Sequence, residues 1–464
     1  MKNKISVLIF ISIAIIIVGY FITSFVYPKN AGRYPVFIAI LLLDVYLWVS
    51  IKNIISNLFS GETHGRASLH GNGRASLHGN DRASLLKYLI IIIYWLPLTV
   101  IVLFMGISIF LPITTWNPAF RTYLFGIVFT IAVAKLFPIF FLIIDDIIRL
   151  FKILFSSVKK KKLKLKRIRI LQILGISSGI IVFVFLLLGM FLWVYDFKTK
   201  TEIIYLEDLP VEFNDLKIVQ ISDLHLGSWA IKEPLQEAVD LINEQNPDLV
   251  FFTGDLVNFT SDEAFRFENI LRNVKSKYGV FSILGNHDYG NYSHWSSKEA
   301  KQENMKQIFQ FYKDINWKLL LDTNYILEIN NEKIAIIGVE NWGAHARFPK
   351  YGDINQALRG VEDIPTKLLL SHDPSHWDLI ISQKYPDVDI TFSGHTHGFQ
   401  FGIDFAGILW SPAEKLYKHW TGLYSNKSKQ YLYVNPGIGT IGYPGRIGIL
   451  PEISVIILKK EERK

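Results

Sequence analysis

Long apolar stretches in the first 200 residues restrict the fold of this chain more than any other feature. They cover about residues 5–27, 35–59, 86–111, 120–144 and 170–195, and each is long enough to cross a bilayer as a helix. Backbone groups inside hydrocarbon must be paired within the segment, which favours helices. We therefore expect an all-α membrane region of about five transmembrane helices over residues 1–199, followed by a separate domain over residues 200–464.

The basic residues between these stretches predict the orientation of the helices. The net charge is +8, and the segment from Lys159 to Arg169 alone carries eight positive charges. Basic loops stay in the cytoplasm, so this segment is expected inside and everything after residue 196 outside. The sequence thus predicts a multi-pass protein of the cell membrane with an extracytoplasmic second domain. Because the basic excess lies between membrane helices, it indicates no nucleic acid partner.

Two features of the membrane region have more than one interpretation. Asp44 and Lys135 are ionisable residues within apolar stretches, where such residues often have a function. A mutual ion pair that fixes helix packing explains them equally well. Residues 61–85 contain an eight-residue repeat, Gly-Arg-Ala-Ser-Leu-His-Gly-Asn, whose composition favours a flexible loop over a histidine metal site.

After residue 200, short apolar runs alternate with amphipathic segments. The amphipathic segments at about 233–244, 262–275 and 298–312 are expected to be helices, and the apolar runs are expected to be strands. This alternation predicts an α/β domain in which helices cover sheets. The predicted strands are residues 217–221, 249–253, 280–284, 334–339, 367–370, 390–392, 431–434 and 453–458.

Polar fragments follow five of these predicted strands. Ligands of α/β sheets gather beyond the carboxyl ends of strands, so the fragments are expected to meet at one edge. A single histidine of this kind is usually structural, but five of them, together with Asp223, Asp255 and Asn286, indicate a metal centre. The fragments are Asp223-Leu224-His225, Gly254-Asp255, Gly285-Asn286-His287-Asp288, Ser371-His372-Asp373 and Gly394-His395-Thr396-His397.

The types of residue limit the metals that such a centre would bind. The chain has no cysteine, so a thiolate site is excluded. Mixed oxygen and imidazole ligands favour Mn²⁺, Fe²⁺, Zn²⁺ or a similar divalent ion. Two such ions close together could activate a hydroxide and neutralise phosphate oxygens.

The fragments and their order resemble the calcineurin-like metallophosphoesterases. Residues 435–439 and 444–446 resemble a membrane-anchored branch of that family, although Phe399 and Pro436 depart from its usual residues. The resemblance implies a sandwich of two mixed β-sheets flanked by helices, with two divalent metal ions. We expect the two departures to affect the substrate pocket more than the metal ligands.

The resemblance also implies a role for each candidate residue. His287 matches the histidine that assists the leaving group or the transition state, which suits an imidazole near neutral pH. No substrate-binding residue is assigned. The implied ligands are Asp223, His225 and His397 for one metal ion, Asn286, His372 and His395 for the other, and Asp255 as a bridge between both.

The sequence therefore predicts a membrane-bound enzyme that hydrolyses phosphate esters by attack of a metal-bridging hydroxide. Its expected partners are a phosphoester substrate, lipid-linked or not, and the lipid bilayer. One alternative is a lipid-linked pyrophosphate hydrolase similar to UDP-2,3-diacylglucosamine hydrolase, whose nucleotide substrate conflicts with the predicted orientation. Another is a non-catalytic membrane sensor or transporter with a phosphoester-binding domain.

One further cluster has two interpretations. The amphipathic aromatic residues Trp410, Tyr417, Trp420 and Tyr424 suit the headgroup layer of a bilayer. Packing against a sheet explains them about as well.

Overall fold

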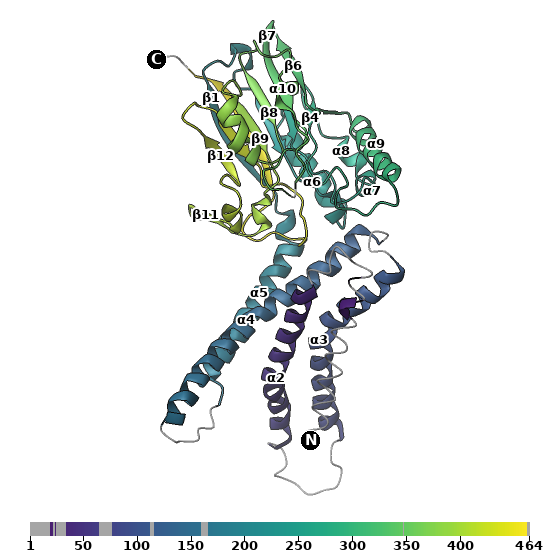
Figure 1. Cartoon of the computed structure of the whole chain (residues 1–464), viewed down its shortest axis with the longest axis vertical. Coiled ribbons are helices and arrows are strands. Elements are labelled where there is room, and N and C mark those ends of the chain that lie inside the picture. Colours follow the sequence, from purple (N-terminus) through teal and green to yellow (C-terminus); the bar gives the residue numbers. More distant parts are fainter. Residues whose placement is uncertain are drawn as a thin grey trace. The chain divides into compact units, whose positions relative to one another are not determined.

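The computed structural model describes residues 19–21, 24, 34–64, 77–111, 116–158, 166–346 and 348–461. The chain divides into two compact units, which can be followed by colour in Figure 1. The first unit comprises Met1–Thr115 and Val128–Val184, and the second comprises Trp116–Ile127 and Phe185–Lys464. The second unit therefore combines the predicted α/β domain with short pieces of two apolar stretches.

Four of the predicted apolar stretches are helical. Those at 35–59, 86–111, 120–144 and 170–195 fall largely within α2 (Tyr34–His64), α3 (Leu77–Phe110), α4 (Pro118–Val158) and α5 (Arg169–Phe191). Among the described residues, two helices are long and apolar enough to cross a membrane, Pro118–Phe155 and Arg169–Tyr195, and Tyr88–Phe104 is a shorter apolar helix. The stretch predicted at 5–27 lies outside the described residues, apart from residues 19–21 and 24.

The prediction of a loop over residues 61–85 is wrong at both ends. Helix α2 continues to His64, and α3 already begins at Leu77. Alanine, arginine and leucine in the repeat are good helix formers, and an adjoining apolar helix extends into them at little cost because its first turn already exists. Residues 65–76 lie outside the described part of the chain.

Asp44 and Lys135 form the mutual ion pair that was one of the two interpretations. The Lys135 ammonium lies 3.0 Å from the Asp44 carboxylate and donates to the carbonyl oxygen of Tyr94 at 3.1 Å. It also lies 4.2 Å from the centre of the Tyr94 ring. These contacts join α2, α3 and α4, so the pair fixes helix packing.

Two six-stranded mixed sheets form the frame of the second unit (Figure 1). In the first sheet, β1 and β14 are parallel, β14 and β2 are antiparallel, and β2, β3, β4 and β5 are parallel. Its order is β1 (Lys198–Leu206), β14 (Glu452–Lys460), β2 (Lys217–Ile221), β3 (Leu249–Phe252), β4 (Val280–Ser282) and β5 (Trp317–Leu319).

In the second sheet the four middle strands, β13, β9, β8 and β7, are parallel, and both edge strands are antiparallel to their neighbours. Its order is β12 (Gly422–Ser425), β13 (Tyr431–Val434), β9 (Ile390–Ser393), β8 (Lys367–Leu370), β7 (Glu332–Gly338) and β6 (Thr323–Ile329). A separate hairpin consists of β10 (Ile403–Phe405) and β11 (Ile408–Trp410).

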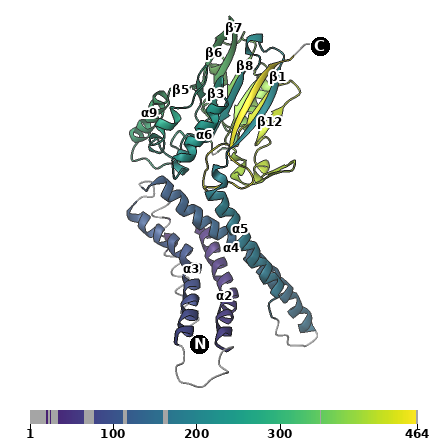
Figure 2. The same cartoon turned by 180° about the vertical axis from the view of Figure 1, so that it is seen from behind.

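The two sheets pack face to face, as the resemblance implies. Alternate side chains of each strand point to opposite faces, so Phe251 of β3 faces the second sheet and Phe252 faces the helices. The rings of Phe251 and Phe392 of β9 have their centres 5.0 Å apart across the sandwich. Helices α6 (Glu233–Glu244) and α9 (Lys298–Asp314) pack on the outside of the first sheet, and both are labelled in Figure 2.

The outer face of the second sheet is covered by shorter pieces. Ile354, Trp377 and Ile381 share a core with the residues of β7 and β8 that point away from the first sheet. They belong to α10 (Ile354–Ala357) and a π-helical turn (Trp377–Ile381), which runs into α11 (Ser382–Lys384).

The single helix predicted at 262–275 is wrong, because the chain forms two short helices there. They are α7 (Asp262–Phe265) and α8 (Glu268–Leu271). Between them Phe267 adopts φ −105° and ψ 0°, which breaks the helix and directs its fully buried ring into the core. The sequence pattern alone did not show this, since the apolar spacing is the same on either side of the break.

Candidate metal centre

The predicted site residues all follow strands whose carboxyl ends meet at one edge of the sandwich. Asp223 and His225 follow β2, Asp255 follows β3, and Asn286 follows β4 of the first sheet. In the second sheet, His372 follows β8, and His395 and His397 follow β9. The two edges are tied by Gln220, whose amide donates to the carbonyl oxygen of Ser393 at 2.8 Å.

One group of candidate ligands consists of Asp223, His225 and His397. The Nε2 atoms of the two histidines are 3.0 Å apart, and His397 Nε2 lies 3.1 Å from Asp223 Oδ1. All three side chains are buried. Three ligand atoms within 4.8 Å of one another could hold a metal ion.

A second group consists of Asp255, His372 and His395. His372 Nε2 lies 3.3 Å from Asp255 Oδ2 and 3.2 Å from His395 Nδ1. The same Asp255 oxygen lies 3.5 Å from Nε2 of His225 in the first group. Asp255 therefore lies between the two groups, which is the position expected of a bridging ligand.

The donor set fits divalent cations. Pairs of imidazole nitrogens face one another at 3.0 and 3.2 Å, an approach that a shared cation explains well because both nitrogens can then offer lone pairs. His372 Nδ1 contacts the carbonyl oxygen of Thr253 at 2.7 Å, which leaves Nε2 directed at the group. Asn286 donates to Tyr292 at 2.9 Å, while its buried Oδ1 has no hydrogen-bond partner among the described residues.

The surroundings favour metal-binding protonation states for most of these groups. Burial lowers the pKa of His225 well below its usual range and that of His395 to about 4, so both are neutral. Burial opposes ionisation of Asp223 and Asp255, but neighbouring histidines outweigh it and lower the pKa of both. His372 differs, because the Asp255 carboxylate outweighs burial and raises its pKa to about 10.

The backbone at the site adopts an uncommon conformation. Five of the seven predicted ligands have positive φ angles, a region that costs a residue other than glycine on the order of 1–3 kcal/mol. Such strain is typical of functional sites, where neighbouring contacts hold it in place. The angles are 53° for Asp223, 44° for His225, 59° for Asp255, 71° for His395 and 52° for His397.

His287 lies beside these groups. Its backbone N–H donates to Asp255 Oδ1 at 2.8 Å, and its Nδ1 contacts the carbonyl oxygen of Asn258 at 2.7 Å. Its ring centre is 4.9 Å from that of His225 and 4.3 Å from that of Tyr292. Since Nδ1 is held by the backbone, Nε2 is the nitrogen left for a substrate.

Sequence reasoning missed three residues that support the site. Asp288 accepts backbone N–H bonds from Gly285, Asp255, Leu256 and Val257 at 2.8–3.2 Å and so ties the loops after β3 and β4. Asp373 and Tyr417 both approach Nε2 of His395, at 3.5 and 2.9 Å. Asp288 and Asp373 directly follow predicted site residues and could have been found, whereas nothing in the sequence links Tyr417 to His395.

Arg446 has a structural role next to the site. Its guanidinium is fully buried and donates to the carbonyl oxygens of Pro436 and Gly439. The N–H of Gly439 in turn donates to the carbonyl oxygen of Asp223 at 2.9 Å. Arg446 thus stabilises the loop that supports a candidate ligand.

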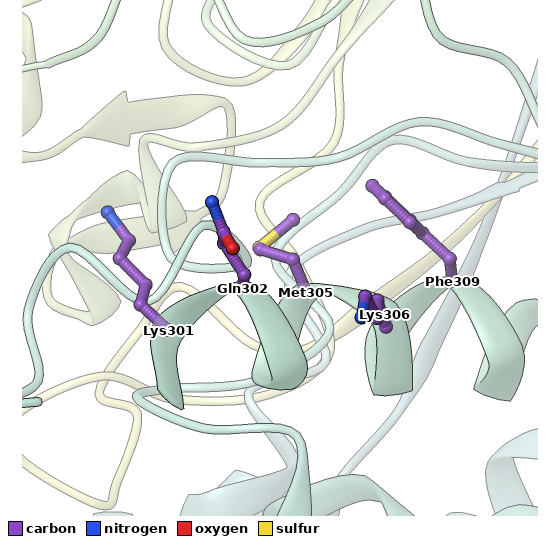
Figure 3. A pocket seen from close by; sticks show the side chains of 5 residues that line it. All are labelled: Lys301, Gln302, Met305, Lys306 and Phe309. Carbon is purple, nitrogen blue, oxygen red and sulfur yellow. The ribbon is translucent and has the colours of Figure 1, made fainter. Parts of the chain in front are cut away.

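A depression on the surface of α9 is separate from these groups. Its volume is about 350 Å³, and Figure 3 shows its side chains along the helix. It contains none of the predicted site residues. It is lined by Lys301, Gln302, Met305, Lys306 and Phe309.

Two family models match the chain. Residues 216–399 match the model described as calcineurin-like phosphoesterase. Residues 32–192 match the model described as probable calcineurin-like phosphoesterase, transmembrane domain. The two matches together include all of the candidate ligands and helices α2 to α5.

Known proteins resemble about half of the chain. An uncharacterized metallophosphoesterase of Bacillus subtilis is 31% identical over 256 residues, which cover 54% of this chain and 82% of that protein. A transmembrane protein with metallophosphoesterase domain from Danio rerio is 30% identical over 265 residues. That match covers 55% of each protein, so the chain spans about half the length of this relative.

Among solved structures, a 5′-nucleotidase precursor from Thermus thermophilus is similar with a TM-score of 0.33 and 14% identity. The similarity covers 53% of this chain and 54% of that one. At that TM-score it supports no inference about this chain.

Proposed function

Because this chain belongs to the calcineurin-like phosphoesterase family and is a membrane protein, we propose that it is a metal-dependent hydrolase of phosphate ester bonds. The position of Asp255 carries this proposal. Its carboxylate lies within 3.5 Å of a histidine of each candidate group. The same oxygen, Oδ2, faces both groups, and one carboxylate oxygen has two lone pairs with which it can serve two cations at once.

The proposed ligands are those predicted from the sequence. Asp223, His225 and His397 would hold one divalent ion, Asn286, His372 and His395 the other, and Asp255 both. Two such ions would supply a nucleophilic hydroxide at neutral pH and positive charge that neutralises phosphate oxygens. The buried, hydrogen-bonded side chains hold this arrangement before the substrate arrives.

His287 is the proposed proton donor. Hydrolysis adds water across a phosphorus–oxygen bond, so phosphorus receives the hydroxyl and the leaving alkoxide requires a proton. Asn258 holds Nδ1 of His287, which directs Nε2 away from the backbone. A proton on Nε2 can then pass to the leaving oxygen, and solvent restores it.

The proposed setting is a multi-pass protein of the cell membrane whose metal centre lies on the extracytoplasmic side. The basic segment from Lys159 to Arg169 supports this orientation. A reporter active on only one side of the membrane, fused at Lys464, tests it. Reporter activity on the cytoplasmic side would show the opposite orientation and favour the nucleotide-linked lipid substrate.

Hydrolysis by the purified full chain tests the proposed function. We expect metal-dependent release of p-nitrophenol from p-nitrophenyl phosphate or from its bis-ester, together with bound metal by elemental analysis. The matched control is the Asp255→Asn variant. Absence of hydrolysis with each of Mn²⁺, Fe²⁺, Zn²⁺ and Ni²⁺ would favour a sensor or transporter that binds phosphoesters without cleaving them.

A further inference from the structure

The hairpin formed by β10 and β11 exposes an apolar surface that no other described part of the second unit covers. It pairs with neither of the large sheets. All six residues of its two strands are exposed, and Phe405 and Ile408 near the turn are 77% and 60% exposed. We call residues 401–410 the apolar hairpin. Its exposed apolar residues are Phe401, Ile403, Phe405, Ile408, Leu409 and Trp410.

Such a surface is unfavourable in water. A two-stranded hairpin is marginally stable by itself, and it normally needs further strands or a covering helix. A continuous apolar patch of this kind marks contact with a protein or a membrane. Only one acidic residue, Asp404, interrupts the apolar residues of the two strands.

The base of the apolar hairpin is hydrogen-bonded to the segment of the chain that packs on α5. Gly402 N–H donates to the carbonyl oxygen of Ile447 at 2.8 Å, and Ile447 N–H donates to that of Gln400 at 2.8 Å. The preceding residue, Arg446, donates its backbone N–H to the carbonyl oxygen of Gly189 of α5 at 3.1 Å. Figure 1 shows β11 near the end of α5 at which the α/β domain begins.

This contact places the hairpin close to a helix that is apolar enough to cross a membrane. The last turns of α5, residues 185–191, belong to the same compact unit as the hairpin. There Phe185 and Phe191 are 49% and 50% exposed, so the apolar surface of the helix end continues near the hairpin. The bilayer around this part of α5 is therefore the partner that the apolar hairpin can contact.

The apolar hairpin is also joined to the metal centre at both of its ends. It begins four residues after the candidate ligand His397, and Ser411 donates to the carbonyl oxygen of Gly398 at 2.7 Å. Beyond it, the Tyr417 hydroxyl lies 2.9 Å from His395. Any surface into which the apolar hairpin inserts would therefore lie beside the candidate ligands.

We propose that the apolar hairpin inserts into the interfacial layer of the bilayer that α5 crosses. Phe405 and Ile408 enter the acyl boundary, and Trp410 lies at the level of the headgroups, where aromatic rings with a polar edge are favoured. Insertion holds the metal centre beside the membrane surface, where phosphate headgroups are found.

The absence of cysteine from the chain allows a direct test. The full chain carrying Phe405→Cys is labelled with an environment-sensitive fluorophore and placed in phosphatidylcholine nanodiscs, one chain per disc. Quenching by lipids brominated at two acyl depths gives the depth of the probe. We expect the probe about 5–10 Å below the headgroup boundary, as for an interfacial segment.

The matched control is Lys333→Cys on the exposed β6–β7 hairpin, which carries no apolar tip. A further variant carries the probe at Leu409→Cys together with Phe405→Asp and Ile408→Asp, and we expect its quenching to fall to the control level. Equal quenching at Phe405→Cys and Lys333→Cys would overturn the proposal, whether the apolar hairpin then faces water or a second copy of the chain.

Failure of this proposal is distinguishable from failure of the proposed function. Quenching requires no turnover, so it reports insertion even in an inactive protein. Hydrolysis of p-nitrophenyl phosphate, which is soluble in water, is measured in the same nanodiscs. Strong quenching without hydrolysis would reject the enzyme and keep the insertion, whereas hydrolysis without quenching would do the reverse.

Discussion

Individual side chains decide the chemistry that the site can perform, and Asp255 contacts both groups of candidate ligands. It lies within 3.5 Å of His225 and 3.3 Å of His372, and it accepts the backbone N–H of His287. A neutral amide at this position keeps the shape but removes the negative charge. The proposed function needs this charge, because two cations close together would repel one another.

We therefore expect Asp255→Asn to lose metal and turnover together. The loss of metal affinity should exceed the roughly 10–100-fold that is typical when an outer partner of a ligand is removed. Metal content by elemental analysis and the rate of p-nitrophenyl phosphate hydrolysis measure it. Asp387→Asn, on the surface, is the control. Full metal content in Asp255→Asn would contradict a bridging role.

His287 is expected to act on the leaving group rather than on the metals. The variant His287→Ala should keep its bound metal and lose about 10²–10⁴-fold in kcat, the usual contribution of a general acid. The loss should be larger for an alkyl phosphate than for p-nitrophenyl phosphate, whose leaving group needs no proton. An equal loss for both substrates would assign His287 to binding instead.

At the scale of elements, the loop after β3 depends on a buried carboxylate from α7. Glu263 accepts the backbone N–H groups of Asn258 and Phe259 at 2.6 and 3.1 Å and lies 3.6 Å from the guanidinium of Arg121 in α4. Asn258 is the residue whose carbonyl oxygen holds His287. Glu263 is therefore a positioning residue for the proposed proton donor.

Glu263 should also make stability depend on pH. Burial raises its pKa from 4.5 to about 7. Between these two values the folded chain binds more protons at Glu263 than the unfolded chain, so the group lowers stability as pH rises through the window. We expect the thermal midpoint of the wild type, relative to Glu263→Gln, to fall between pH 5 and pH 7. A difference that stays constant over this window would contradict the shift.

At the scale of the whole molecule, a membrane region and the candidate metal centre occur in one chain but in largely separate compact units. The candidate ligands come from segments between residues 223 and 397, so the proposed metal binding concerns the second unit. The Asp44–Lys135 pair belongs to the first unit and serves its packing.

Removal of metal is accordingly expected to destabilise the second unit alone. Ions that bind only the folded state add about 4 kcal/mol at a thousandfold excess over Kd, and without them the buried carboxylates Asp223 and Asp255 repel one another. Calorimetry of the full chain in detergent, with and without a chelator, measures the midpoint. The unfolding transition of the membrane region in the same calorimetric scan serves as the internal control. An unchanged midpoint would mean that no bound metal ion stabilises the folded second unit.

Much of the site could be predicted because its chemistry is local in sequence. Each fragment ends a buried strand, and parallel strands bring such ends to one edge. The strands β2, β8 and β13 begin and end where their apolar runs do. The edge strand β1 was missed because its first half, Lys-Thr-Lys-Thr-Glu, is polar and exposed, and it pairs with β14 from the far end of the chain.

The sequence by itself determined which residues are candidate ligands, their order and the presence of both a membrane region and an α/β domain, because hydrophobic period and residue type are properties of short segments. Only the tertiary structure decided that Asp255 lies between the two groups, that Tyr417 reaches His395 and that Glu263 supports the loop of Asn258. It also decided that Tyr417 and Trp420 are buried while the apolar hairpin is exposed. These facts depend on contacts between distant segments, which no local pattern encodes.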